Sequence, residues 1–324
     1  IGNEVMRIQE FQNNTINNVS IGSGAGFARF CASDAELAEQ KIERPAIVNA
    51  SRAINADETA NCNANGLNPV EFRVGTDALA IVVSADNDFL TQVTTDELKA
   101  IFGTAELWSD ISSDFPDEPI QLIIPGEDSG TFDFFVEELF DGDSSVLLAN
   151  EGGDVTRIND VITSENDNQL VGSISSDRYS IGFFGYAYYL ENSDDLTLLT
   201  IDGITPGADT VDDGSYSLSR PLFIYSDPQI MQDQPHIASF IDYYLTHTNE
   251  VIDGVGYFPA SDEALDEARQ NWMSATGLDA MEDIDPATVA GHIETAGSST
   301  VFPISEAIKA IFVEAGFVPR LTVE

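Results

Sequence analysis

ALAIVVSA, residues 78–85, is a continuous run of small and β-branched apolar residues, which is typical of a strand buried on both faces. TTDELKAIFG (94–103) follows with the signals of a helix, since Thr stands at its start, acids lie in the first turn and Gly ends it. The segments 180–190 and 196–203 are expected to return the chain to its first domain. Further strands are expected at 120–126 and 219–226, and helices at 129–142 and 235–247. This alternation predicts an α/β fold with mostly parallel sheets.

The chain is strongly acidic: its 324 residues include 56 Asp and Glu against 13 Lys and Arg, for a net charge of −43. Such a field repels nucleic acid and anionic lipid, so we expect neither as a partner. A hydrated acidic coat suited to saline surroundings is favoured over a calcium-binding coat. The best calcium-loop candidate, 86–97, lacks the glycine that an EF-hand loop has at its sixth position. No run of about 18 apolar residues occurs, so the sequence predicts no membrane insertion.

Two cysteines, Cys31 and Cys62, are present. The chain begins at Ile1 without Met, which leads us to expect a processed, exported chain or a segment of a longer one. In an exported chain an even number of cysteines favours one disulfide over two buried thiols. No CxxC motif occurs and the three His are scattered, so the sequence predicts neither a metal site nor a cofactor.

Three segments share one pattern, in which small and hydroxyl residues lead into an apolar helical stripe: 20–31, 125–135 and 297–316. The N–H groups and the dipole at a helix N-terminus favour an anion, and Ser or Thr adds a donor without adding charge. A desolvated dianion also requires a cation. Arg52, in NASRAIN (49–55), is the candidate; the alternative is a surface Arg paired with a carboxylate.

The motifs GSSTVFPISEA, IGSGAGFARFC, NASRAI, PGEDSGTFDFF, IGFFGYAYY and GSYSLSRPLFIY are spread over nearly the whole chain. Together they resemble the periplasmic phosphate-binding proteins of ABC-type phosphate importers, especially the cyanobacterial-like branch. The resemblance implies the two-lobed periplasmic binding protein fold (type II), with two α/β lobes, a two-strand hinge and phosphate bound between the lobes. It also implies a non-catalytic receptor that is periplasmic or extracellular.

Carried over residue by residue, the resemblance implies a phosphate site built from several loops. Its members are Ser299, Thr300, Val301 and Phe302 in one loop, Ser23 in a second, Ser129, Gly130 and Thr131 in a third, and Ser51 with Arg52. Better-known members have an Arg where Pro125 stands and an Asp where Arg52 stands. We therefore expect Arg52 to supply the cation from the lobe opposite the one that contains Pro125. The acceptor for the phosphate proton is then Glu127 or Asp128, or is absent, which puts selectivity against sulfate in doubt.

The order of the motifs differs from the family pattern. In the family GSSTVFP opens the mature chain, whereas here it begins at residue 297, and residues 1–18 have no counterpart. Either the fold is circularly permuted, or the chain is one period of a tandem array whose tail, 295–324, completes a neighbouring copy. We expect one lobe from 1–80, 200–280 and 295–324, a second from 81–199, and a linker at 281–294.

Three functions follow as hypotheses. The first is a phosphate receptor that delivers to an ABC importer, and the second is a polymerising extracellular protein joined head to tail through residues 295–324. The third is an enzyme with Ser129 or Thr131 as nucleophile. No His can be assigned to activate such a nucleophile, so the sequence predicts no enzyme.

Overall fold

The computed structural model describes residues 11–12, 14–127, 129–148, 161–278, 285–317 and 320–321. The chain forms two compact units. Unit 1 comprises Ile1–Gly75, Pro221–Val255 and Pro259–Glu324, and unit 2 comprises Thr76–Arg220 and Gly256–Phe258. Two strands, β4 (Val70–Ser84) and β11 (Ser219–Ser226), therefore each begin in one unit and end in the other.

The sheet of unit 1 has its C-terminal strand in the interior. β12 (His292–Gly297) lies between β2 (Thr15–Ser20) and β3 (Ile47–Ala50), and it runs parallel to both. On the far side of β3 the sheet continues with β11, which is antiparallel to β3, and then with β4. The segment that contains the hydroxyl loop at 297–302 is thus part of this chain's own sheet.

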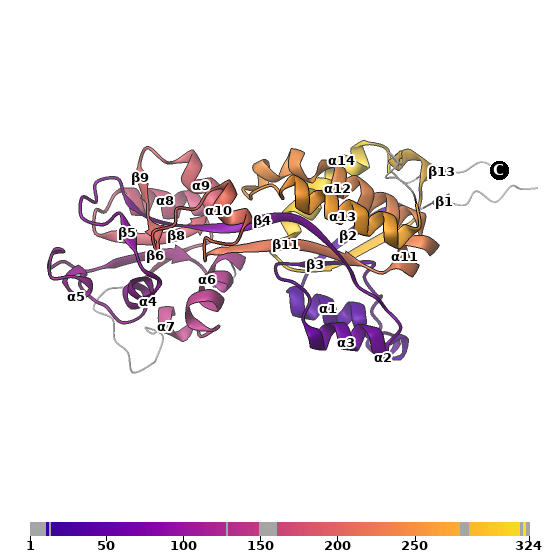
Figure 1. Ribbon diagram of the computed structural model, residues 1–324, viewed down its shortest axis with the longest axis horizontal. Coiled ribbons are helices and arrows are strands. Elements are labelled where there is room, and N and C mark those ends of the chain that lie inside the picture. Colours follow the sequence, from indigo (N-terminus) through magenta and orange to yellow (C-terminus); the bar gives the residue numbers. More distant parts are fainter. Residues whose placement is uncertain are drawn as a thin grey trace, which may run out of the picture. The chain divides into compact units, whose positions relative to one another are not determined.

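Helices cover both faces of the unit 1 sheet (Figure 1). One face carries α1 (Ser23–Cys31), α2 (Asp34–Gln40) and α3 (Ala56–Ala64). The other carries α11 (Pro228–Asp233), α12 (Pro235–Val255), α13 (Asp262–Thr276) and α14 (Phe302–Glu314). The chain also forms a short 3-10 helix, Pro286–Thr288, and an antiparallel pair of β1 (Phe11–Gln12) with β13 (Arg320–Leu321).

Buried side chains on each face explain why these helices dock. On the first face Phe27 packs edge-on against Tyr225, with ring centroids 5.0 Å apart. On the second face Phe240 of α12 packs against Phe312 of α14, with centroids 5.1 Å apart. A Cβ added at Gly26 of α1 would lie 2.7 Å from the Cα of Gly297, so glycine is required for α1 to approach β12 this closely.

The sheet of unit 2 is centred on β8 (Ser180–Gly185), with β4 on one side and β6 (Gln121–Pro125) on the other. β8 is antiparallel to β4 and parallel to β6. The remaining elements are β5 (Gln92–Val93), β7 (Ile162–Ser164), β9 (Leu196–Leu198), β10 (Thr200–Ile201), α4 (Thr95–Gly103), α5 (Trp108–Ile111), α6 (Gly130–Phe140), α7 (Ser145–Leu148), α8 (Asp167–Ser175), α9 (Tyr186–Glu191) and α10 (Ala208–Asp212).

The core of unit 2 is rich in phenylalanine. Phe135 of α6 stacks on Phe183 of β8, with ring centroids 3.8 Å apart, and Phe102 of α4 packs edge-on against both rings. The apolar stripe expected at 129–142 is therefore the buried face of α6. The predicted capping of α4 is also confirmed, because the Thr94 hydroxyl accepts from the backbone N–H of Glu97.

The expected bounds and sheet type differ from the structure in two respects. Residues 76–80, 200–220 and 256–258 belong to unit 2 rather than to the first lobe, because β10 pairs with β5 and the start of β11 lies within that unit. The end of the expected linker, 292–294, belongs to β12 in unit 1. The sheets are mixed rather than mostly parallel, because β4 and β11 pair antiparallel with β8 and β3. The prediction that 180–190 and 196–203 return to the first domain is therefore wrong, because both segments lie in unit 2.

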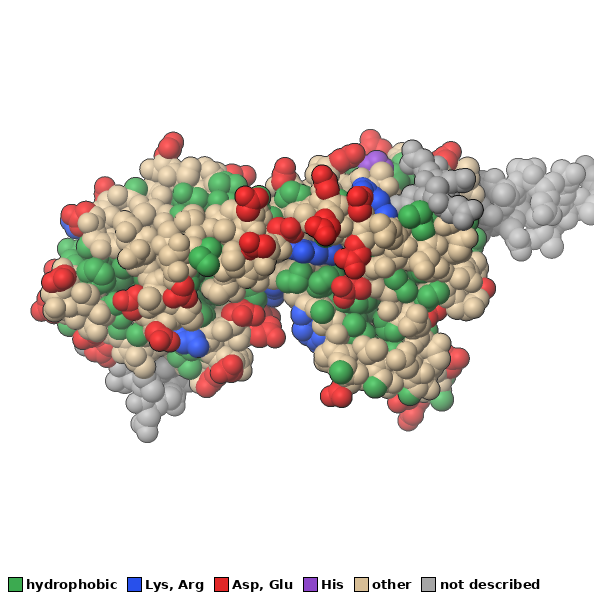
Figure 2. Space-filling model, in the orientation of Figure 1, with side chains coloured by type: hydrophobic (Ala, Val, Ile, Leu, Met, Phe, Trp, Pro, Cys, Tyr) green, Lys and Arg blue, Asp and Glu red, His purple; other side chains and the backbone are tan. Residues whose placement is uncertain are grey.

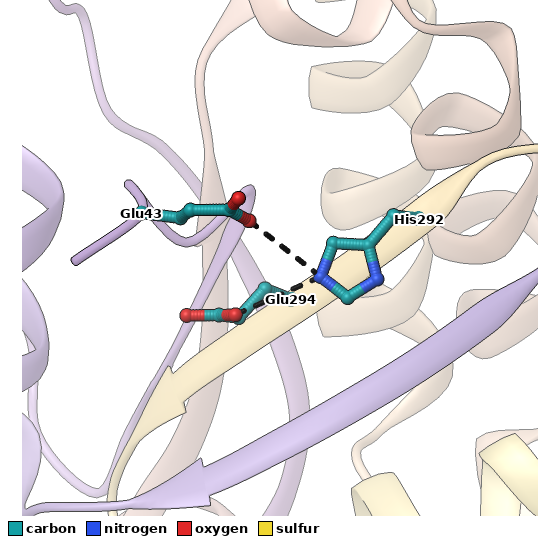
Figure 3. Close-up of side chains that lie close together, drawn as sticks. All are labelled: Glu43, His292 and Glu294. Carbon is teal, nitrogen blue, oxygen red and sulfur yellow. Dashed lines mark ion pairs between the residues drawn. The ribbon is translucent and has the colours of Figure 1, made fainter. Parts of the chain in front are cut away.

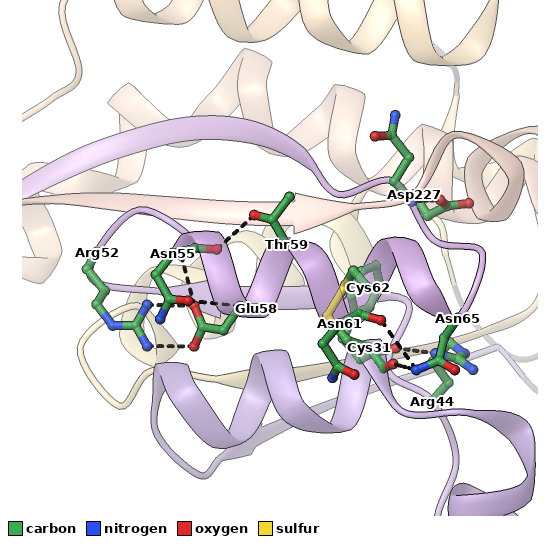
Figure 4. Close-up of a disulfide and its surroundings, with 12 residues drawn as sticks. Cys31, Arg44, Arg52, Asn55, Glu58, Thr59, Asn61, Cys62, Asn65 and Asp227 are labelled. Carbon is green, nitrogen blue, oxygen red and sulfur yellow. Dashed lines mark hydrogen bonds and ion pairs between the residues drawn. A yellow bond between two sulfur atoms is a disulfide. The ribbon is translucent and has the colours of Figure 1, made fainter.

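A disulfide joins Cys31, at the end of α1, to Cys62 in α3 (Figure 4). The Cα atoms are 4.3 Å apart and both side chains are buried beside Phe30 and Val48. The side-chain amide of Asn65 donates to the carbonyl oxygen of Cys31 at 2.8 Å. The predicted disulfide is confirmed.

We expect the double substitution Cys31→Ala and Cys62→Ala to lower the free energy of unfolding by about 3–4 kcal/mol. The cross-link closes a loop with a sequence separation of 31. Closing a loop of this size lowers the conformational entropy of the unfolded chain, which raises its free energy by about that amount. Urea unfolding with and without dithiothreitol measures the effect. Reductant should lower the wild-type midpoint and leave the double variant unchanged; equal midpoints for the two proteins would show that the cross-link contributes nothing.

Acidic side chains are spread over the face of each unit seen in Figure 2, while Lys and Arg occur at few places on it. None of the helices in the described parts of the chain has both the length and the low polarity needed to cross a bilayer.

Candidate anion-binding site

The hydroxyl loops of unit 1 follow the carboxyl ends of three neighbouring strands. β2, β12 and β3 are parallel, so their carboxyl ends meet at one edge of the sheet. β2 leads into α1 at Ser23, β3 leads into Ser51 and Arg52, and β12 leads into the loop 297–302 before α14. Ligands of open α/β sheets commonly bind at such an edge.

Hydrogen bonds hold these three loops together. The Ser23 hydroxyl accepts from the backbone N–H of Ser51 at 3.1 Å, and the two hydroxyl oxygens are 3.3 Å apart. The backbone N–H groups of Ile21 and Gly22 both donate to the carbonyl oxygen of Gly297 at 2.9 Å. The structure thus brings the predicted Ser23 and Ser51 together, next to the start of the third loop.

Arg52 lies beside this cluster. A Cβ placed on Gly24, the residue after Ser23, would be 3.6 Å from an Arg52 guanidinium nitrogen, and the guanidinium also lies over the Phe27 ring. The same guanidinium forms a two-point ion pair with Glu58, at 2.8 and 2.9 Å (Figure 4). Arg52 therefore lies near the N-terminus of α1 and is paired with a carboxylate, as the alternative interpretation of the sequence described; its role as the cation of an anion site stays a prediction.

Glu58 fixes Arg52 and caps α3 at the same time. Its carboxylate accepts from the backbone N–H of Asn55, and the Asn55 side chain accepts from the Glu58 N–H in return. Burial raises the pKa of Glu58, but the hydrogen bonds from Arg52 and Asn55 and the Arg52 charge outweigh it, so this pKa lies below its usual value. Glu58 is therefore a carboxylate at neutral pH and orients the guanidinium.

The loop 297–302 satisfies part of its own backbone. The Thr300 N–H donates to the Ser298 hydroxyl at 3.2 Å, and the Phe302 N–H donates to the Ser298 carbonyl at 3.2 Å. Ser298 itself donates its N–H to the Asn49 carbonyl at 2.8 Å. Thr300 and Val301 are buried and Ser299 is exposed. Two of the expected backbone donors are thus engaged inside the loop, and an anion at this position would compete with those bonds.

In unit 2 the predicted residues Ser129, Gly130 and Thr131 form the N-terminus of α6. Ser129 is the N-cap, and its hydroxyl accepts from the Thr131 N–H at 3.2 Å. Glu127, one expected proton acceptor, is exposed in the preceding turn, and Asp128 lies outside the described residues.

Arg220 holds this first turn of α6 in place. Its guanidinium donates to the Gly130 carbonyl at 3.0 Å, forms a buried ion pair with Asp77 at 3.0 Å and lies over the Phe134 ring at 4.1 Å. Burial raises the pKa of Asp77, whereas the charge and hydrogen bonds of Arg220 lower it; the net direction is upward. Arg220 is thus a positioning residue for the α6 loop.

Sequence reasoning did not single out Glu58 or Arg220. Glu58 could have been found from the spacing Asn55-x-x-Glu58, which is a capping box. Arg220 stands within SRPLFIY, but nothing local in the sequence pairs it with Asp77 or with the SGT loop.

Two α/β units joined by strands that run from one into the other, with hydroxyl loops after their strands, define the type II periplasmic-binding-protein fold. A family model described as "PBP superfamily domain" matches residues 7–248. The chain is 37% identical over 253 residues to the protein SphX of Synechocystis sp., covering 75% of this chain and 69% of SphX. It is 32% identical over 255 residues to the phosphate-binding protein PstS of Staphylococcus haemolyticus, which covers 77% of this chain and 73% of PstS.

A solved structure is also similar to this chain. A possible phosphate binding protein from Planctomyces limnophilus is similar, with a TM-score of 0.65, 27% identity, and coverage of 81% of this chain and 99% of that one. The chain belongs to the PBP superfamily and, within it, to the family that contains SphX and PstS. The resemblance noted in the sequence is confirmed.

Proposed function

We propose that this protein is a receptor for inorganic phosphate. The observation that carries the proposal is the gathering of Ser23, Ser51 and Arg52 at the carboxyl ends of parallel strands in unit 1. A relative at 32% identity is a phosphate-binding protein, which supports the same ligand.

The chemistry of these groups suits a tetrahedral dianion. Arg52 supplies a positive charge, and its ion pair with Glu58 keeps the guanidinium in one orientation. The Ser23 and Ser51 hydroxyls add neutral donors, and the N-terminus of α1 adds a favourable dipole. We propose that Ser299, Thr300, Val301 and Phe302 complete the unit 1 part of the site. In unit 2, Ser129, Gly130 and Thr131 at the N-terminus of α6 offer donors of the same kind.

We further propose that the protein acts outside the cytoplasm, delivers phosphate to an ABC importer and catalyses no reaction. The hypothesis of a polymer joined through residues 295–324 finds no support, because β12 pairs with β2 and β3 of its own chain and α14 packs against α12. We propose instead that this tail completes the unit 1 of the same molecule, in a circularly permuted order.

Calorimetric titration of phosphate into ligand-stripped protein tests the proposal, with sulfate as the matched oxyanion. We expect one site per chain whose affinity is maintained or increased when NaCl is raised from about 0.05 to about 0.5 M. The reason is that salt screens the repulsive acidic surface beyond about 8 Å but leaves short contacts intact. Absence of heat and of a thermal shift at millimolar phosphate contradicts the proposal, as does a steep loss of affinity with salt. Equal binding of sulfate contradicts phosphate selectivity alone.

A further inference from the structure

The opposite edge of the unit 1 sheet carries a second cluster of polar side chains. Because β2, β12 and β3 are parallel, their amino ends also meet at one edge, away from the hydroxyl loops. His292 and Glu294 point from β12, and Glu43 comes from the segment before β3 (Figure 3). The ligand atoms of these three side chains all lie within 4.8 Å of one another.

The geometry of the cluster is close to that of a metal site. The Nε2 atom of His292 is 3.8 Å from a carboxylate oxygen of Glu43 and 3.7 Å from one of Glu294, and both oxygens face the same ring nitrogen (Figure 3). Ligand atoms about 2.0–2.2 Å from a tetrahedral ion are separated by about 3.3–3.6 Å, so small side-chain movements suffice to bring all three onto one ion.

Two further sets of contacts orient these three side chains. The Thr15 hydroxyl is hydrogen-bonded to Nδ1 of His292, which fixes the ring and leaves Nε2 directed at the carboxylates. Arg29 forms an ion pair with the other carboxylate oxygen of Glu294 and donates to the carbonyl of Glu43. Glu294 is mostly buried and thereby held in one orientation, while Glu43 and His292 are accessible from solvent.

We propose that Glu43, His292 and Glu294 bind one transition-metal ion of the Zn²⁺ type, with water in the remaining position. An imidazole ligand selects such ions over Ca²⁺ and Mg²⁺, which prefer oxygen alone. Two carboxylates and Arg29 leave the cluster with one net negative charge, which a divalent cation compensates. The bound ion would link β12 to the segment that leads into β3.

Titration of Zn²⁺ into EDTA-treated, dialysed protein tests this proposal, in phosphate-free buffer containing millimolar Mg²⁺ to saturate the acidic surface. We expect one tight Zn²⁺ site per chain and a rise in melting temperature on binding. His292→Ala and Glu43→Gln should each weaken the site at least about tenfold and abolish the thermal shift. His247→Ala is the matched control, because His247 lies in α12 and pairs with Glu250.

X-ray absorption at the zinc edge should show nitrogen and oxygen ligands that include one imidazole. Retention of the tight site in both His292→Ala and Glu43→Gln overturns the proposal, and so does displacement of Zn²⁺ by Mg²⁺, which would assign binding to the acidic coat. Glu43 is exposed, so Glu43→Gln keeps the test decisive if His292→Ala fails to fold.

Discussion

Replacing Arg52 with alanine is expected to weaken phosphate binding at least about 100-fold, which corresponds to about 2.7 kcal/mol. The substitution removes the cation beside the Ser23–Ser51 cluster, so the negative charge of the anion is left uncompensated. It also leaves the Glu58 carboxylate without its partner and close to the anion, which adds repulsion. Calorimetric titration of phosphate into the variant measures the change.

Arg269→Ala is the control for Arg52→Ala. It changes the net charge equally, but Arg269 lies on α13 in an ion pair with Asp266 that is partly exposed. We expect this variant to bind phosphate as the wild type does. Near-wild-type affinity of Arg52→Ala would show that the cation of the site has been misplaced, even if the protein is a phosphate receptor.

Replacing Arg220 with methionine is expected to lower the free energy of unfolding by about 3–5 kcal/mol at about pH 8, because it leaves Asp77 buried without a cation. The loss should be smaller at about pH 5. Without Arg220 the pKa of Asp77 rises further above its value in the unfolded chain, so folding takes up a proton and the variant gains stability as pH falls.

Urea unfolding of the wild type and of Arg220→Met at about pH 8 and about pH 5 measures this effect. Arg178→Met is the control, because Arg178 forms a more exposed ion pair with Asp88 in the same unit and should change stability little at either pH. A loss for Arg220→Met that is independent of pH would show that Asp77 stays charged. No loss at all would show that the pair contributes no net stability.

Local elements and motifs could be predicted from the sequence because their signals are local. The cap at Thr94, the apolar stripe of α6 and the buried strands can each be recognised within a few residues. The loop containing Ser23 shows such a local pattern, whereas Ser51 follows from the family resemblance; the structure brings the two hydroxyls together.

Pairing between distant segments could not be predicted in this way. No local pattern shows that β12 inserts between β2 and β3, or that β4 and β11 each span two units. The contacts of Arg220 with Asp77 and of His292 with Glu43 join residues far apart in the chain, so they depend on that topology. Scattered His residues therefore gave no sign of a metal cluster in the sequence.

The interior position of β12 sets an order in which the two units can fold during synthesis. Thr15 and His292 are neighbours in the sheet but 277 residues apart in the chain. β2 therefore cannot pair with β12 until the 277 residues that follow Thr15, up to His292, have been synthesised, and pairing over so long a separation is slow. Unit 2 is almost continuous in sequence, from Thr76 to Arg220, so it can fold before the last strand of the unit 1 sheet has been synthesised.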